Sequence, residues 1–242
     1  MAKIHMLLQG KGGVGKSLIS SILAQYIQYK HNILPCCIDT DPVNSTFGGY
    51  RSLNVKTLHL LENDEINTRN IDTLIEWIAA TNIDAVIDNG AATFVPLAHY
   101  IISNQIADLL ETMGHKLIVH TVITGGQALV DTINGFAQLV KQFPENIEFV
   151  VWLNEFWGKI EAQSKNFEEM KAYKDYKNRV STIIRIPSVK EETFGKDISE
   201  MLKNKQTFKE AIEDKNLSIM SRQRLNIYKD KIFTQLNLMA DI

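Results

Sequence analysis

One short glycine-rich stretch carries the residue types and the spacing that are needed to hold phosphate groups. It reads Gly10-Lys11-Gly12-Gly13-Val14-Gly15-Lys16-Ser17 and fills every fixed position of the pattern G-x-x-x-x-G-K-[ST]. Glycines let the backbone turn tightly and approach a phosphate closely, because no Cβ intrudes. We expect Lys16 to place its charge on the β- and γ-phosphates and the Ser17 hydroxyl to bind Mg²⁺. The stretch therefore predicts a site for nucleotide phosphates and magnesium.

Aspartates follow two apolar segments further along the chain. Residues 32–39 indicate a buried strand that runs into the loop Asp39-Thr40-Asp41-Pro42-Val43-Asn44, and residues 84–88 indicate another strand, which ends in Asp88. The carboxyl ends of parallel strands form the ligand-binding edge of such a sheet. At that edge Asp88 would order the water shell of Mg²⁺. The loop after Asp39 has a second interpretation as a turn stabilised by its two aspartates.

The elements that must position these residues can be predicted from apolar periodicity. Residues 3–8 form an apolar run of strand length, and apolar residues recur at helical spacing from Leu18 to Lys30, so the glycine loop lies between a strand and a helix. This context separates a true phosphate-binding loop from a chance match. Backbone N–H groups of the loop and the N-terminus of the helix would then face the phosphates.

The rest of the chain alternates predicted strands and helices. We expect further strands at 56–61 (an edge strand), 116–124, 147–153 and 180–186, and helices at 71–80, 94–112, 127–143, 191–202, 208–212 and about 218–238. Residues 62–70 are expected to form a loop that could contact a partner. This order predicts an α/β fold, a mostly parallel β-sheet flanked by helices on both faces. We expect a single nucleotide-binding domain over residues 1–242, on which the terminal helix packs.

Composition and charge constrain the function less than the motifs do. The 242 residues are 45% hydrophobic and 22% charged, with a net charge of −2, which does not recommend a nucleic-acid partner. Between Lys159 and Lys209, however, 12 basic residues face 8 acidic ones. That segment is interpreted as a solvated helical face, with phosphate or acidic lipid as the alternative partner.

Cysteine, histidine and apolar content predict where the protein works. Cys36 and Cys37 are adjacent and cannot form an ordinary structural disulfide, so we expect small core residues in a reducing compartment. His99, His115 and His120 are not at ligand spacing, and no structural metal is expected. The chain begins directly with a strand and contains no apolar run that could span a bilayer. We therefore expect a cytoplasmic protein, at most peripheral at the inner membrane.

The second lysine of the glycine loop narrows the class of protein. The loop GKGGVGKS resembles the deviant Walker A loop of the superfamily that includes the ParA, MinD, nitrogenase-reductase and tail-anchored-protein-targeting families. The resemblance implies a dimer that sandwiches nucleotide, in which Lys11 reaches the phosphates of the partner. It also implies that Asp39 holds Mg²⁺ through water and that Asp41 positions the attacking water. Residues 88–91, Asp-Asn-Gly-Ala, depart from the family's D-x-P-P, so details of that loop are not carried over.

The same resemblance implies contacts with the adenine base. Asn154, at the end of a predicted strand, occupies the place of an asparagine that reads the adenine edge, and a side-chain amide can both donate and accept hydrogen bonds there. Pro187 resembles the turn that flanks the base. Trp157 has two interpretations, stacking on the base or packing in the fold.

A closer resemblance extends along nearly the whole chain. The segments IHMLLQGKGGVGKS, IDTDPVN, VIDNGAATFVPLAHY, TVITGGQALVDT, FVVWLNEFWG and IPSVKEETFGKD are similar to the ParA/MinD-type ATPases encoded in the transfer regions of IncP-type conjugative plasmids. This resemblance implies a bacterial protein that serves plasmid transfer, with ATP or ADP and Mg²⁺ as ligands. The ATPase would be slow and stimulated by a partner, would form a homodimer on ATP, and would contact proteins of the conjugation machinery.

Two alternatives stay open at this point. The first is a nucleotide-gated protein that binds DNA without sequence specificity, for which the basic segment 159–209 is the motivation. The second is a metabolic member of the superfamily, such as a carboxylating synthetase of the biotin pathway, in which ATP would serve a small acid. A dimer that forms with ATP alone would favour the switch, whereas turnover that requires a small acid would favour the synthetase.

Overall fold

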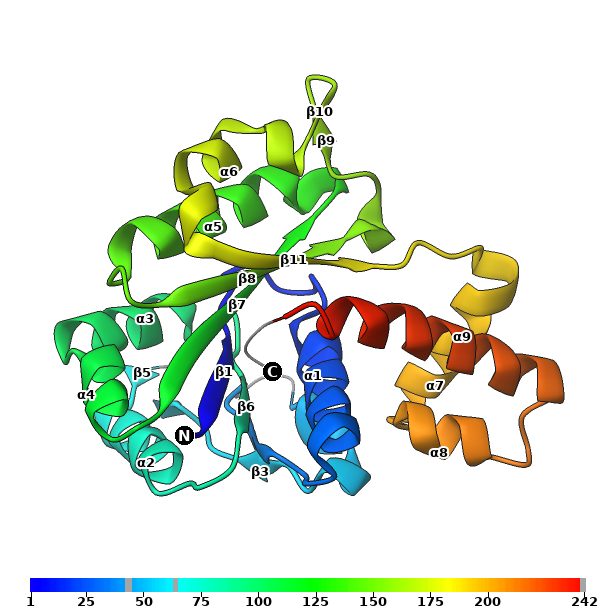
Figure 1. The fold of residues 1–242 in the computed structure, drawn as a ribbon, viewed down its shortest axis with the longest axis horizontal. Coiled ribbons are helices and arrows are strands. Elements are labelled where there is room, and N and C mark those ends of the chain that lie inside the picture. Colours follow the sequence, from blue (N-terminus) through cyan, green and yellow to red (C-terminus); the bar gives the residue numbers. More distant parts are fainter. Residues whose placement is uncertain (42–44, 63–64, 240–242) are drawn as a thin grey trace.

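A computed structural model describes residues 1–41, 45–62 and 65–239. Among these residues, seven strands form one parallel sheet in the order β11-β8-β7-β1-β6-β2-β3 (Figure 1). The strands are β1 Lys3–Leu7, β2 Cys36–Asp39, β3 Lys56–Thr57, β6 Ala85–Asp88, β7 Lys116–Thr124, β8 Glu148–Asn154 and β11 Val180–Ile186. Two small antiparallel hairpins are built from β4 Leu61–Glu62 with β5 Glu65–Ile66 and from β9 Glu161–Ala162 with β10 Lys165–Asn166. The part of the predicted aspartate loop at 42–44 lies outside the described residues.

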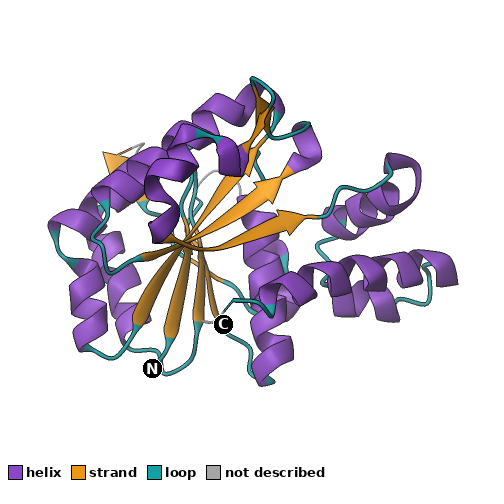
Figure 2. Cartoon of the chain, turned by 45° about the horizontal axis from the view of Figure 1, so that its top comes forward, coloured by secondary structure: helices purple, strands orange, loops and turns teal. Residues whose placement is uncertain are grey.

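Helices cover both faces of the sheet (Figure 2). The α-helices are α1 Lys16–His31, α2 Thr68–Ala79, α3 Phe94–Ser103, α4 Ile106–Thr112, α5 Leu129–Gln142, α6 Lys171–Tyr176, α7 Lys196–Lys203, α8 Phe208–Glu213 and α9 Ile219–Leu236. Short 3₁₀ turns lie at Phe47–Gly49, Arg51–Leu53, Gly126–Ala128, Glu155–Trp157, Phe167–Glu169 and Lys177–Arg179, and a π-turn at Glu191–Gly195 precedes α7. The predicted fold class, a parallel α/β sheet with helices on both faces, is confirmed.

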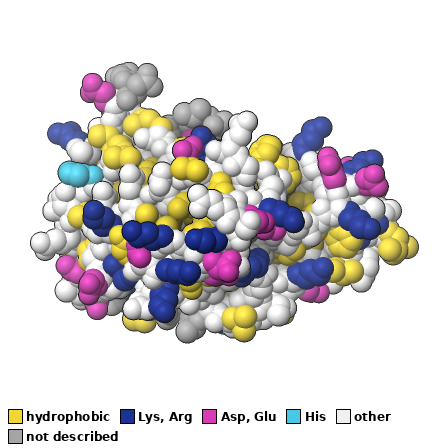
Figure 3. Space-filling model, turned by 90° about the horizontal axis from the view of Figure 1, so that it is seen from above, with side chains coloured by type: hydrophobic (Ala, Val, Ile, Leu, Met, Phe, Trp, Pro, Cys, Tyr) yellow, Lys and Arg dark blue, Asp and Glu magenta, His cyan; other side chains and the backbone are white. Residues whose placement is uncertain are grey.

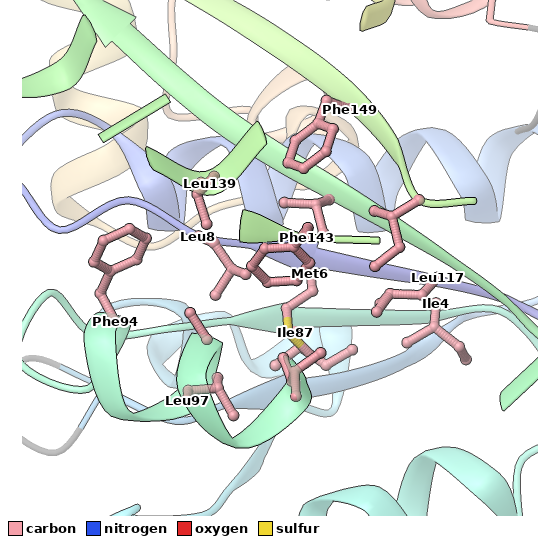
Figure 4. Close-up of a cluster of buried hydrophobic side chains, with 14 of the residues drawn as sticks. Ile4, Met6, Leu8, Ile87, Phe94, Leu97, Leu117, Leu139, Phe143 and Phe149 are labelled. Carbon is pink, nitrogen blue, oxygen red and sulfur yellow. The ribbon is translucent and has the colours of Figure 1, made fainter. Parts of the chain in front are cut away.

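The two faces of the sheet bury separate apolar clusters because side chains alternate along each strand. Ile4, Met6 and Leu8 point toward the side covered by α2, α3, α4 and α5, where they pack with Ile87 and Phe149 (Figure 4). Leu7, on the opposite face, packs in the cluster that α1, α7, α8 and α9 share. Strands buried on both faces are apolar at nearly every position, which is why they could be recognised as short continuous runs.

Helix α9 contributes one buried stripe to the second cluster. The buried residues are Leu225, Tyr228, Ile232, Phe233 and Leu236, and Met239 beyond the helix is buried with them. The helix also contacts the edge strand β11, because the Gln235 side chain bonds the backbone N–H and C=O of Arg185 at 2.8 Å each. Across the described chain, no helix combines the length and apolar character required to cross a membrane.

Several predicted boundaries are wrong. The predicted helix at 94–112 is two helices, which break at Asn104 and Gln105, where Gln105 has a φ of 49° in the left-handed region. Part of the predicted loop at 62–70 is helical, since α2 begins at Thr68 with the Asn67 side chain as its N-cap. The predicted strand at 32–39 begins only at Cys36. Helix α6 and the β9–β10 hairpin were not predicted.

The register of the sheet brings the predicted site residues to one edge. Leu7, the last residue of β1, lies beside Asp88, and Asp88 lies beside Asp39 at the end of β2. On the other side, Thr124 and Ile186 both pair with Asn154 at the end of β8. The carboxyl ends of these strands therefore surround the glycine loop that follows β1, at the point where the strand order reverses.

Candidate functional site

The glycine loop joins β1 to α1 and adopts a conformation that requires glycine. Gly13 and Gly15 have φ values of 73° and 102°, in the region that other residues rarely enter. Lys16, the first residue of α1, is buried, and its Nζ donates a hydrogen bond to the backbone oxygen of Lys11 at 3.1 Å. Burial lowers the pKa of Lys16, while Asp88 and Asp41 act in the opposite direction. The loop thus holds one cation inside a tight turn of backbone.

Asp88 is a buried carboxylate at this edge of the sheet. Its side chain is only 1% exposed, and neither carboxylate oxygen has a hydrogen-bond partner among the described residues. Burial raises the pKa of this carboxyl to about 7, against the lowering influence of Ser17, Ser20 and Lys16. A buried carboxylate without partners is costly, so such a group points to a ligand that the fold itself does not supply.

Asp39 is buried next to Asp88 but is differently surrounded. Its Oδ2 accepts hydrogen bonds from the backbone N–H of Gly48 at 2.7 Å and from the Ser45 hydroxyl at 3.1 Å, and its Oδ1 accepts one from the N–H of Asp41 at 3.0 Å. Burial raises the pKa of Asp39, and these hydrogen bonds oppose the rise. The Asp41 side chain lies against Gly90, where a Cβ would come within 3.1 Å of its carboxylate.

These residues fit a magnesium site that is completed by water and phosphate. Mg²⁺ prefers oxygen ligands, usually keeps several waters, and needs only one or two carboxylates. The unpartnered oxygens of Asp88, with Asp39 and Ser17 beside them, supply that kind of donor set. Within the described part of the chain, no three His, Cys, Asp or Glu side chains are grouped closely enough to form a protein cage for a metal. The donor set therefore suits a metal that arrives with a phosphate ligand.

Lys11 points away from the interior of the loop. Its Nζ forms an ion pair with Asp131 Oδ2 at 2.8 Å, and the two side chains are 45% and 55% exposed. Asp131 belongs to the first turn of α5, which starts after β7. Exposed ion pairs contribute about 0–1 kcal/mol, so this contact can be exchanged for another at little cost. The structure thus places Lys11 and Lys16 on different sides of the same loop.

Asn154 lies directly under the glycine loop. Its Nδ2 donates to the backbone oxygen of Val14 at 2.9 Å, and its Oδ1 accepts from the N–H of Phe156 at 3.2 Å. A Cβ at Gly15 would come within 2.9 Å of the same Nδ2, so the close approach depends on glycine. Among the described residues, no hydrogen bond uses the second amide proton or the second lone pair of Asn154 Oδ1. Pro187 follows β11, the strand that pairs with β8, and is half-buried.

Trp157 also contacts the loop, from its outer side. The indole Nε1 donates to the backbone oxygen of Gly13 at 3.1 Å, although the side chain is 59% exposed. Phe156 is 78% exposed and meets the Trp157 ring edge to face, at 4.9 Å between centroids. This exposure argues against packing in the core as the reason for Trp157. No local pattern predicts its hydrogen bond to the loop.

A second cluster missed by sequence reasoning orders the two loops after β2 and β6. Asn89 is buried, and its Oδ1 accepts hydrogen bonds from Thr40 at 3.2 Å and from Thr93 at 2.7 Å, while its Nδ2 donates to the oxygen of Gly90. Thr40 also donates to the backbone oxygen of Asp88. Asn89, which stands at the variable position of the family's D-x-P-P pattern, therefore ties together the loops that carry Asp41 and Asp88.

An open groove of about 520 Å³ lies at the opposite edge of the sheet. It is lined by residues at the start of β2 and the end of α2, among them Cys36, Trp77 and Ile83, and by Lys56, whose Nζ lies 5.3 Å from the centre of the Trp77 ring. None of the predicted site residues lines this groove.

Comparison with known proteins also indicates a nucleotide-binding domain. Residues 5–216 match the family described as the CobQ/CobB/MinD/ParA nucleotide binding domain. Two proteins of Escherichia coli, each called Protein TraL, are 60% identical to the chain over 240 residues, which cover 99% of this chain and 99% of each relative. Among solved structures, the MinD cell division protein of Aquifex aeolicus aligns over 96% of this chain and 98% of its own, with 13% identity and a TM-score of 0.47.

Proposed function

The chain belongs to the CobQ/CobB/MinD/ParA nucleotide-binding family, and from this premise we propose that it is an ATP-hydrolysing dimerisation switch that serves plasmid conjugal transfer. The observation that carries the proposal is the buried carboxylate of Asp88, which has no hydrogen-bond partner among the described residues and lies at the end of a strand next to the glycine loop. Mg²⁺ bound with ATP would satisfy that carboxylate. The identity to TraL supports conjugal transfer as the process.

The roles of the site residues follow from phosphoryl transfer, which needs positioning and charge neutralisation more than covalent chemistry. Lys16 would neutralise charge on the β- and γ-phosphates from inside the loop. Ser17, with Asp39 and Asp88 acting through water, would hold Mg²⁺, which supplies positive charge to the phosphate oxygens when bound. Asp41 would position the attacking water. Asn154 and Pro187 would contact the adenine.

Dimerisation on ATP is proposed from Lys11. Its ion pair with Asp131 is exposed and therefore weak, so Lys11 can leave it for the phosphates of a second copy. Each copy would then complete the site of its partner, and hydrolysis would release the pair. Slow turnover, raised by a protein of the transfer machinery, is the behaviour proposed for such a switch.

Phosphate release and molar mass in solution test this function together. The wild-type protein should release phosphate from ATP only with Mg²⁺ and should double its mass with ATP, measured by light scattering. Lys16→Ala should lose hydrolysis and nucleotide binding. Lys11→Ala should still bind ATP but stay a monomer, and a Lys11→Ala protein that dimerises and hydrolyses normally would contradict the cross-dimer role. A plasmid mating assay with Lys16→Ala as the only copy of the gene tests the link to transfer.

Non-specific DNA binding is a second candidate, favoured by one feature of the surface. Figure 3 looks down on the side that carries α6 and the β9–β10 hairpin, and Lys and Arg side chains gather there. Within residues 159–177, the exposed lysines are Lys159, Lys165, Lys171, Lys174 and Lys177. Among the residues that the structure describes, no ion pair joins any of these lysines to a carboxylate. A polyanion would therefore meet these lysines without breaking an ion pair.

Charge reversal on α6 tests this candidate. A protein with Lys171, Lys174 and Lys177 all changed to Glu should lose ATP-dependent binding to a DNA duplex, and the binding of the wild type should weaken steeply with salt. Lys215→Glu combined with Lys231→Glu is the control, because both lysines are exposed and lie outside the basic segment 159–209. Equal DNA binding by all three proteins, or binding that salt does not change, would rule the candidate out.

A further inference from the structure

Two side chains hold consecutive carbonyl groups of the glycine loop. Trp157 Nε1 donates to the oxygen of Gly13, and Asn154 Nδ2 donates to the oxygen of Val14. A peptide unit is planar and trans, so its C=O and its N–H point in opposite directions. The N–H groups of Val14 and Gly15 belong to these two peptide units and therefore point away from Trp157 and Asn154. Successive N–H groups aimed to one side are what an anion-binding concavity requires.

The segment that carries Asn154 and Trp157 is held in place by contacts with the end of β7 and the turn that follows it. The backbone oxygen of Asn154 accepts a hydrogen bond from the Thr124 hydroxyl at 2.7 Å. The turn after β7 presses on the same loop, because a Cβ at Gly125 would lie 2.2 Å from the oxygen of Gly158, and one at Gly126 would lie 2.5 Å from the oxygen of Trp157. Only glycine allows this approach, so the backbone of Trp157 is held against the sheet edge while its ring stays exposed.

The exposed position of the Trp157 indole suggests that this side chain has a functional role. A tryptophan that is 59% exposed gives up most of the free energy that its burial would contribute, and its N–H could bond water instead. Instead, the indole N–H donates to the backbone oxygen of Gly13, in the loop that is proposed to bind phosphate. We propose that Trp157 is a positioning residue for the phosphates of the bound nucleotide: its indole fixes the Gly13–Val14 peptide so that the loop N–H groups meet the phosphate oxygens.

This inference rests on the proposed function, since it assumes that the loop binds nucleotide, and it separates two roles at the site. Trp157 acts on the phosphates and makes no demand on the base. Asn154 shares the bracing role through Val14 and keeps one donor and one acceptor for adenine. A loop whose peptides are fixed before binding loses less entropy when the phosphates arrive.

Trp157→Phe removes the indole N–H and keeps an aromatic ring, so it tests the brace directly. We expect Mg·ATP, Mg·ADP and inorganic tripolyphosphate to bind about three- to tenfold more weakly, by the same factor for each, which is the size of one hydrogen bond. Competition against a fluorescent ATP analogue measures all three. Tripolyphosphate carries no base, so its weakening is a readout that a stacking role would not move. Trp77→Phe, the same change at the other edge of the sheet, is the matched control and should bind like the wild type.

The outcomes separate this proposal from the proposed function. If Trp157→Phe binds all three ligands like the wild type, the brace is overturned and the nucleotide site stands. If it weakens ATP and leaves tripolyphosphate unchanged, the indole contacts the base and the brace is again overturned. If the wild-type protein binds none of the three, the proposed function and the brace fail together. A thermal melt of Trp157→Phe within a degree or so of the wild type shows that folding is intact, as the exposed position leads us to expect.

Discussion

Replacing Asp88 with asparagine is expected to stabilise the metal-free protein and to remove its response to Mg²⁺. Asp88 is 1% exposed, and both of its oxygens lack hydrogen-bond partners among the described residues. The charge therefore costs stability until a cation arrives. An asparagine has nearly the same shape and carries no charge, so it removes the cost of burying one.

The magnitude follows from the pKa of Asp88, which burial raises from 3.8 to about 7. Because the folded-state pKa lies above the unfolded one, the folded protein favours the protonated carboxyl. The contribution of this carboxyl to the stability of the protein is thus fully present below pH 3.8 and is lost as the pH rises through about 7. One pKa unit corresponds to about 1.4 kcal/mol, so the charged carboxylate costs about 4 kcal/mol at about pH 8. We expect Asp88→Asn to recover about 2–4 kcal/mol there and almost nothing near pH 4.

Denaturant unfolding in the presence of EDTA, at several pH values, measures this gain. Asp39→Asn is the contrasting control, because the hydrogen bonds that Asp39 accepts from Gly48, Ser45 and Asp41 oppose the effect of burial on its pKa, so removing its charge should recover less stability than Asp88→Asn does. The reasoning is refuted if Asp88→Asn is no more stable than the wild type at about pH 8, or if its gain is the same at every pH.

Further predictions concern other parts of the edge and the sheet. Mg²⁺ should raise the melting temperature of the wild type in the presence of ATP but not that of Asp88→Asn, as scanning calorimetry will show. Asp131→Asn should change the free energy of unfolding by less than about 1 kcal/mol, since its ion pair with Lys11 is exposed; a larger loss in urea unfolding would contradict this. Gly125→Ala should destabilise the protein by about 1–3 kcal/mol or more, because its Cβ would meet the oxygen of Gly158, whereas Gly12→Ala, which meets nothing, should not. Burial, with His5 adding, lowers the pKa of His120 well below 6.5, so its neutral ring is favoured by folding. Stability should therefore be fully present above about pH 6.5 and fall by up to about 1.4 kcal/mol per pH unit below it, a slope that His120→Gln should reduce in pH-dependent unfolding.

Local signals were sufficient to predict most strands of the sheet and the strand ends that carry the site, although the predicted edge strand at 56–61 is in the sheet only at Lys56–Thr57. β11 has the predicted bounds, Val180–Ile186, and β1, β6 and β7 lie where apolar runs indicated. Asp39 and Asp88 could be placed at one edge because parallel strands align their carboxyl ends. The break between α3 and α4 was not predictable in the same way, because both halves continue one apolar pattern and only the left-handed backbone of Gln105 separates them.

Contacts between distant segments explain most of what was missed. Trp157 and Gly13 are 144 positions apart in the chain, and no local pattern links an indole N–H to a loop carbonyl. His5, His120 and Trp152 form a buried row across β1, β7 and β8, in which the indole of Trp152 donates to His120 at 3.0 Å. No local pattern links His5 to His120, because their pairing depends on the order of strands in the sheet.

Calorimetric titration of Mg·ATP into the wild-type protein and into Lys16→Ala is the most direct test of the central claim, that the loop between β1 and α1 is a nucleotide-phosphate site. Lys16 is buried in the loop and its Nζ donates to the backbone oxygen of Lys11, so its removal takes away a cation that lies inside the turn. The account predicts that the wild type binds one Mg·ATP per chain and that Lys16→Ala shows no measurable binding under the same conditions. Equal binding by the two proteins, or no binding by the wild type, would contradict it.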